Sequence, residues 1–161
     1  MGWYPPSRCP PMRDVQWVRF HSVADVRGSL TAVEGEHDVP FPIARVFYMH
    51  DVTPGADRGG HAHRDTDQVA IAVHGSLKLC LADGDTAITV VLDDPRWGVT
   101  LPRMTWTRLY DFSSDGVCLI LASTHYDMSR SIRDWPAYLA ARSLSARPEP
   151  LTGPALVRPH A

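Results

Sequence analysis

Residues 55–75 read GADRGGHAHRDTDQVAIAVHG, and this stretch indicates the fold of the whole chain. Gly55 is followed after five residues by a His-x-His pair, His61 and His63, then after four residues by Gln68 and after six more by Gly75. Side chains alternate along a β-strand, so both imidazoles are expected on one face. The sequence therefore predicts a short strand that presents two titratable rings side by side.

The rest of the chain repeats short β-type segments separated by turn residues such as Asp83-Gly84 and Asp94-Pro95. We expect strands at residues 16–20, 45–51, 68–73, 76–81, 87–92, 98–101, 105–110 and 117–123. Only residues 131–143 predict a helix, which would cap the barrel from outside. The fold class is therefore all-β, a jelly-roll β-barrel with one C-terminal helix.

Length and composition favour a single ordinary domain. The chain has 161 residues, 44% of them hydrophobic, and we expect one domain over residues 15–143 between proline-rich, flexible extensions at 1–14 and 144–161. The net charge of −2 gives no general attraction for nucleic acid or for an anionic membrane. No apolar run is long enough for a bilayer and the N-terminus lacks a signal segment, so the expected compartment is the cytoplasm.

The spacing around the two histidines resembles the metal-binding motif of cupins, with Gln68 in the place of the carboxylate ligand. The last histidine of that motif is expected within LPRMTWTRLYDF, where Thr107 stands instead. A neutral amide and a hydroxyl are poor ligands for divalent metals, so we expect no metal and no other cofactor. Two histidines with Asp65 or Asp67 remain an alternative metal site, and a polar surface turn remains an alternative for His-x-His itself.

The combination of six segments is more specific than the histidine pair. These segments are RGSLTAVEG (27–35), VPFPIARVFYMHDV (39–52), RGGHAHR (58–64), VHGSLKLCLADG (73–84), LPRMTWTRLYDFSSD (101–115) and LASTHYDMSRSIRDWPAYL (121–139). Together they resemble the sugar-nucleotide 3,4-ketoisomerases, the WxcM-like cupins that act on dTDP-4-keto-6-deoxy-D-glucose in deoxysugar and aminosugar biosynthesis. The resemblance implies that His61 and His63 are catalytic and that the reaction needs no metal.

The implied reaction converts a 4-keto sugar into a 3-keto sugar through an enediol. Two imidazoles near neutral pKa suit the required proton transfers, and either histidine could be the base. The resemblance directs attention to Arg27 and Arg45 as partners of the diphosphate, and strand parity counted from Gln68 adds Lys78. Tyr48 is a candidate hydrogen-bond donor to the sugar or the enediol, and Arg58 a candidate to bind substrate or support the loop before the histidines. Gln68 is a further candidate to bind the substrate.

Three other functions remain open at this stage. A dTDP-keto-sugar epimerase would begin with a similar proton abstraction, a non-catalytic cupin would only bind the sugar, and a cupin oxygenase would need a metal. Barrels of this kind often pair edge strands between subunits, so we expect a homodimer. The C4 stereochemistry of the product, gluco or galacto, depends on which face of the enediol meets the acid.

Overall fold

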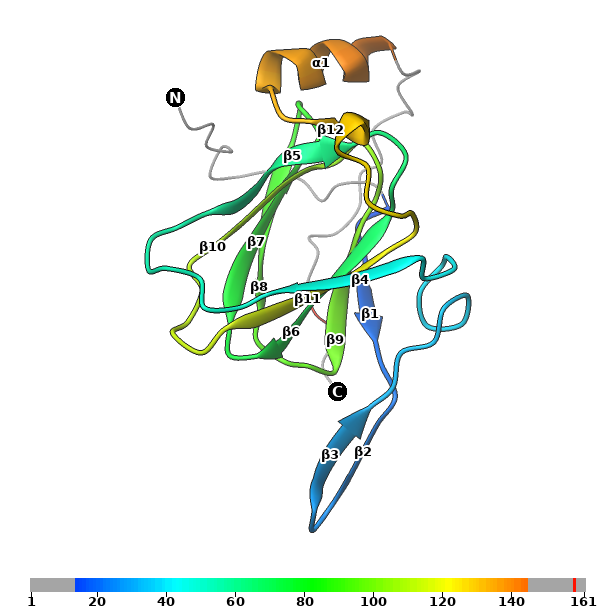
Figure 1. Ribbon diagram of the computed structural model, residues 1–161, viewed down its shortest axis with the longest axis vertical. Coiled ribbons are helices and arrows are strands. Elements are labelled where there is room, and N and C mark those ends of the chain that lie inside the picture. The colour runs from blue at the N-terminus through cyan, green and yellow to red at the C-terminus, as the bar shows by residue number, and fades with distance from the viewer. Residues whose placement is uncertain (1–13, 145–157, 159–161) are drawn as a thin grey trace.

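The computed structural model describes residues 14–144 and Arg158, and in that part the chain folds into two facing antiparallel sheets (Figure 1). The first sheet has the order β1-β9-β6-β11-β4 and the second the order β12-β5-β10-β7-β8. The strands of the first sheet are β1 (Trp17–Arg19), β9 (Trp97–Leu101), β6 (Gln68–His74), β11 (Val117–Ala122) and β4 (Arg45–Met49). The strands of the second are β12 (Ser131–Ile132), β5 (Arg58–His63), β10 (Trp106–Tyr110), β7 (Leu77–Ala82) and β8 (Ala87–Leu92).

The main core lies between the two sheets. Ala70 and Ala72 of β6 face Leu77, Leu79 and Leu81 of β7, and all five are at most 1% exposed. Small residues on the first sheet and leucines on the second therefore fill the space between the sheets. The all-β jelly-roll prediction is confirmed, and so are the eight expected strands, whose observed ends differ from the expected ones by at most two residues.

A two-stranded hairpin of β2 (Ser22–Asp25) and β3 (Gly28–Thr31) stands apart from both sheets. It projects away from the body of the molecule at the bottom of Figure 1. Val23 and Leu30 on this hairpin are 53% and 63% exposed, although both are apolar. We did not expect this hairpin from the sequence, because its residues do not bury one face as the other strands do.

The C-terminal helix α1 (Trp135–Leu144) begins later than the expected residue 131. Ser131 and Ile132 instead form β12, which pairs with β5 after the short 3-10 helix η1 (Met128–Arg130). Asp134 then caps the helix, because its Oδ2 accepts a hydrogen bond from the Ala137 backbone N–H at 2.9 Å. Pro136 is tolerated since the first turn of a helix has no internal partner for its missing N–H.

Helix α1 covers one end of the second sheet through Tyr138. The Tyr138 hydroxyl lies 3.0 Å from the carbonyl oxygen of Ala82 and 2.9 Å from that of Met104. Its ring packs with those of Trp106 and Trp135. The helix is therefore fixed to the end of β7 and to the loop that leads into β10.

Most of the two expected extensions lies outside the described residues. Arg158 is described, and its guanidinium lies 5.1 Å from the centre of the Trp17 ring and forms an ion pair with Asp93. This one position of the C-terminal segment therefore contacts the domain. No helix in the described part of the chain is long and apolar enough to cross a membrane.

Candidate active site

His61 and His63 lie side by side on β5, as their spacing predicts. Their Nε2 atoms are 3.2 Å apart, and the ring planes meet at 87° with centroids 4.8 Å apart. Ala62 between them is fully buried on the opposite face, in a cluster with Trp106, Ile132 and Tyr138 beneath α1. The two rings are half-buried, so both are shielded from bulk water without being sealed off.

Strand β5 is held on both sides. His61 pairs with Thr107 of β10, and His63 pairs with Ser131 of β12. Gly59, two residues before His61, adopts a φ of +81°, and a Cβ there would lie 2.6 Å from the Thr107 carbonyl oxygen. Only glycine combines this backbone conformation with so close an approach of β10. Gly59 therefore allows β5 to pack this closely against β10.

Two further side chains contact His63. Gln68, which is 6% exposed on the facing sheet, places its Nε2 3.4 Å from the His63 Nε2. On the other side of the ring, the Ser131 hydroxyl lies 3.3 Å from Nδ1. Hydrogen-bond partners at both nitrogens orient an imidazole and select its tautomer. The contact to Gln68 was anticipated by the motif spacing, whereas the contact to Ser131 was not.

The four positions that hold a metal in the cupin motif lie close together here, but two of them carry residues other than the usual ligands, Gln68 and Thr107. Thr107 is buried, pairs with His61 and so shares its face of the sheet, and its hydroxyl donates to the Thr105 carbonyl at 3.4 Å. With Gln68 and Thr107 the group offers two imidazoles, one amide and one hydroxyl. This set lacks the anionic oxygen and the third imidazole that a divalent metal site of this type uses, so it does not fit such an ion.

The pKa values of both imidazoles are lowered. Burial is the largest cause for His63 and brings its pKa from 6.5 to about 4, helped by the nearby charges of His61, Arg45 and Arg133. Burial also lowers the pKa of His61, with Arg133 acting in the same direction. The Nδ1 of His61 is buried without a hydrogen bond of normal geometry, although the Gly59 backbone is near enough to favour the charged ring. Both rings are therefore in their neutral, base-competent form at pH 7.

Arg45 is the one predicted arginine that the structure brings to this region. It begins β4, and its guanidinium lies 5.0 Å from the Phe47 ring centre and 5.4 Å from that of Tyr126. Its Nε is buried and has no hydrogen-bond partner among the described residues. Burial lowers its pKa, and its charge acts on His63. An under-satisfied cation near the histidine pair is suited to bind an anion.

Tyr48 is not brought to the histidines. On β4 the partly buried Phe47 and Met49 pack on the core between the sheets, whereas Tyr48 points the other way and is 62% exposed. It stacks against His50, with ring centres 5.5 Å apart. Strand alternation therefore separates Tyr48 from the site within one chain, contrary to our expectation.

Lys78 also lies on the wrong face for the expected role. Leu77 and Leu79 occupy the inward positions of β7, and the Lys78 ammonium forms an ion pair with Asp111 at 2.8 Å on the outside. We had expected Lys78 to share the inward face of Gln68, because an even number of positions separates the two along the chain. Parity is not preserved there, because the turn at Gly75 carries the chain from the first sheet to the second.

Arg27 and Arg58 lie apart from the pair in this chain. Arg27 is at the tip of the β2–β3 hairpin, where it forms an ion pair with Asp25. Arg58 is exposed at the start of β5, opposite Leu109. The loop before β5 is supported instead by Arg108, whose guanidinium pairs with Asp57 at 2.7 Å.

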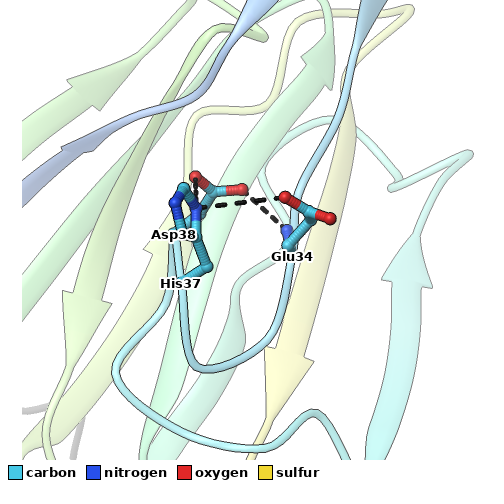
Figure 2. Close-up of side chains that lie close together, drawn as sticks. All are labelled: Glu34, His37 and Asp38. Carbon is cyan, nitrogen blue, oxygen red and sulfur yellow. Dashed lines mark hydrogen bonds and ion pairs between the residues drawn. The ribbon is translucent and has the colours of Figure 1, made fainter.

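Within the described residues, three potential metal ligands meet only at Glu34, His37 and Asp38, in the loop between β3 and β4 (Figure 2). Asp38 Oδ2 accepts the Glu34 backbone N–H at 2.7 Å, and the His37 Nδ1 lies 3.1 Å from Asp38 Oδ1. The backbone hydrogen bond lowers the pKa of Asp38. These contacts close a tight turn, and the cluster is separate from the histidine pair.

Comparison with known proteins identifies the family. The model of the family "FdtA: WxcM-like, C-terminal" matches residues 13–143. The TDP-4-oxo-6-deoxy-alpha-D-glucose-3,4-oxoisomerase of Aneurinibacillus thermoaerophilus is 38% identical over 118 residues, which cover 73% of this chain and 85% of that protein.

Two solved structures support the same assignment. A mutant of the 3,4-ketoisomerase QdtA from Thermoanaerobacterium thermosaccharolyticum, in complex with TDP-4-keto-6-deoxyglucose, superposes with a TM-score of 0.82 at 33% identity, covering 84% of this chain and 99% of that one. The TDP-quinovose 3,4-ketoisomerase WlaRB of Campylobacter jejuni gives a TM-score of 0.77 at 34% identity, covering 80% and 99%. With its histidine pair at the facing sheets and these matches along most of its length, the chain belongs to the FdtA, WxcM-like family.

Proposed function

We propose that this protein is a sugar-nucleotide 3,4-ketoisomerase that interconverts the 4-keto and 3-keto forms of a dTDP-6-deoxyhexose. The observation that carries the proposal is the contact of 3.2 Å between the Nε2 atoms of two half-buried, neutral imidazoles. The relatives named as 3,4-ketoisomerases, one of them solved with TDP-4-keto-6-deoxyglucose, support this substrate class.

The chemistry needs two proton transfers at carbon and two at oxygen. The C4 carbonyl acidifies the C3–H bond, so a neutral imidazole removes that proton while O4 gains one, giving the enediol. The O3 hydroxyl then loses its proton as C4 is protonated, which leaves a ketone at C3. Protons gained equal protons lost, and no external oxidant is needed. Paired imidazoles supply an acceptor and a donor at neighbouring atoms, and either ring can serve as the base at C3.

The same site accounts for a reaction without metal. Gln68 and Thr107 stand where anionic or imidazole ligands would be needed, and Gln68 contacts His63 instead. In our proposal the developing enediolate is stabilised by hydrogen bonds and by nearby cations such as Arg45. Metal analysis of the purified protein, with turnover measured before and after chelation, tests this point. Stoichiometric metal together with chelator-sensitive turnover would favour an oxygenase or another metal-dependent reaction.

Incubation with dTDP-4-keto-6-deoxyglucose in deuterated water, followed by NMR, tests the reaction itself. The expected product carries deuterium at C4 and a new ketone at C3. Exchange at C5 would show an epimerase instead, and binding without any exchange would show a sugar-binding cupin.

We further propose that the protein is a homodimer, supported by the β2–β3 hairpin. This ribbon projects from the body and exposes Val23 and Leu30, and two-stranded ribbons are marginally stable alone in water. A second copy would cover these side chains, and any contribution of Arg27 to substrate binding would then depend on that copy. Light scattering after gel filtration should give twice the chain mass of 17.9 kDa. A monomer that is fully active would contradict the proposal.

A further inference from the structure

Arg133 directly follows β12, the strand that pairs with the end of β5 carrying the histidines, although its position in the sequence gives no sign of this. Antiparallel pairing sets Ser131 opposite His63 and Ile132 opposite Ala62. One more step of this register beyond β12 would bring Arg133 opposite His61. Ser131 contacts the His63 ring and Ile132 lies in the cluster on the other side, so alternation places Arg133 on the face that carries the imidazoles.

The Arg133 guanidinium is free. It makes no hydrogen bond or ion pair with any residue that the structure describes, and its side chain is exposed. Arg130, three residues earlier, is held by Asp65 and Asp127, each at 3.2 Å. The segment therefore ends with one arginine neutralised and one available to a ligand.

The charge of Arg133 reaches the site. It lowers the pKa of both His61 and His63, and Arg45 from the facing sheet acts on His63 in the same way. The two imidazoles are neutral, and Asp65, whose negative charge acts on His63, is already paired with Arg130. Two cations from opposite sheets therefore flank an uncharged pair, and this arrangement attracts an anion.

We propose that Arg133 is a substrate-binding residue that binds the diphosphate group of the sugar nucleotide. A guanidinium offers paired N–H donors that match phosphate oxygens. Its exposure places it at the rim, whereas the enediolate oxygens must form next to the half-buried rings. The identity of the anion rests on the proposed function, because only a nucleotide-sugar substrate brings a diphosphate to this site.

Calorimetric titration with TDP alone measures this role without any turnover. Replacing Arg133 by Gln should weaken TDP binding about ten-fold or more, the loss expected for charge-assisted hydrogen bonds, and Arg133→Lys should recover part of it. Arg64→Gln is the matched control, because this substitution removes the same charge from an exposed position directly after His63. Arg64 is not among the cations that lower the pKa of His63. Its TDP affinity should stay within about two-fold of the wild type.

Kinetics with the keto sugar nucleotide complete the test. The Arg133→Gln variant should raise KM with little change in kcat. Unchanged TDP affinity combined with a shifted pH profile would show that Arg133 acts only on the imidazoles and would overturn the proposal. An equal loss of TDP affinity in the Arg64→Gln and Arg133→Gln variants would also overturn the proposal, since it would show that only the net charge of the protein matters. Wild type that binds TDP but does not isomerise the sugar would overturn the proposed function and leave the role of Arg133 standing, whereas wild type that does not bind TDP would overturn both.

Discussion

The Nε2 atoms of His61 and His63 lie 3.2 Å apart, at hydrogen-bond distance. One of the two nitrogens must therefore carry a proton and the other must accept it, because two N–H groups would repel each other at this separation. The pair thus holds one acid and one base in contact before any substrate arrives.

Replacing His61 or His63 by Asn should remove most of the activity. Each ring supplies one of the two complementary proton-transfer groups, so a loss of about 10² to 10⁴ in kcat is expected for either variant. TDP affinity measured by calorimetry should stay close to that of the wild type. A fully active His63→Asn variant would exclude that ring from the mechanism.

The acid side of the pH profile should reflect the lowered pKa of His63. Its neutral form is favoured by burial, with a pKa near 4 instead of 6.5. As the pH is lowered from 7, kcat/KM should therefore stay constant through pH 6 and should fall only when the pH approaches 4. A profile that bends near 6.5 would show that this ring is not the essential base of the free enzyme.

The same shift predicts a change in stability with pH. The unfolded chain binds a proton at His63 near pH 6.5 while the folded protein resists it, so stability is full above 6.5 and is lost as pH falls toward 4. Because the ring is partly solvated, its share should be about 1 kcal/mol. Urea unfolding of the wild type and of His63→Asn at pH 7 and pH 5 checks this, and parallel losses in the two proteins would contradict it.

Ser131 should act as a positioning residue through its contact with the His63 Nδ1 at 3.3 Å. Ser131→Ala should lower kcat several-fold and leave KM nearly unchanged, with a shift of the acid limb, since the ring loses one of its two orienting partners. Ser131→Thr should restore part of the rate. Ser143→Ala on the surface of α1 is the control, because within the described residues the Ser143 hydroxyl bonds only to the Ala140 carbonyl. A Ser131→Ala variant with wild-type kcat and pH profile would exclude this role.

Gly59 and Gly60 form a matched pair for testing how β5 is held. Both have positive φ, +81° and +71°, but only at Gly59 would a Cβ meet the Thr107 carbonyl, at 2.6 Å. Gly60→Ala should cost about 1 kcal/mol of unfolding free energy from backbone strain, and Gly59→Ala clearly more because β10 must shift. Thermal unfolding measures the difference. Equal costs would show that strain alone matters at these positions.

The double variant Gln68→Glu with Thr107→His should create a site for a divalent metal. Gln68 contacts His63 and Thr107 shares the face of His61, so the new carboxylate and imidazole would complete a four-ligand set. Zinc titration should show stoichiometric binding by the double variant and much weaker binding by either single variant. Equal zinc affinity in the wild type would contradict our view of why the present residues do not suit a metal.

Features that depend on alternation within one strand could be predicted from the sequence. The shared face of His61 and His63 follows from local parity, and the convergence of Gln68 on the pair follows from the spacing of the motif. Lys78 failed because parity was carried across a turn that changes sheets, and Tyr48 because its strand was never assigned a face. Ser131 and Arg133 were missed for a different reason: they reach the site through the register of β12 with β5, which no local pattern encodes.

The Tyr138 hydroxyl, which contacts the end of β7 and the loop that leads into β10, gives the outer helix an influence on the chemistry. Only three residues separate β12 from Pro136, and Asp134 fixes the start of α1 immediately after Arg133. Any tilt of the helix must therefore move the wall of the site that carries Ser131 and Arg133. The helix holds this wall in place. Substitutions on its buried face, far from any sugar atom, can therefore change which nucleotide sugars the enzyme accepts.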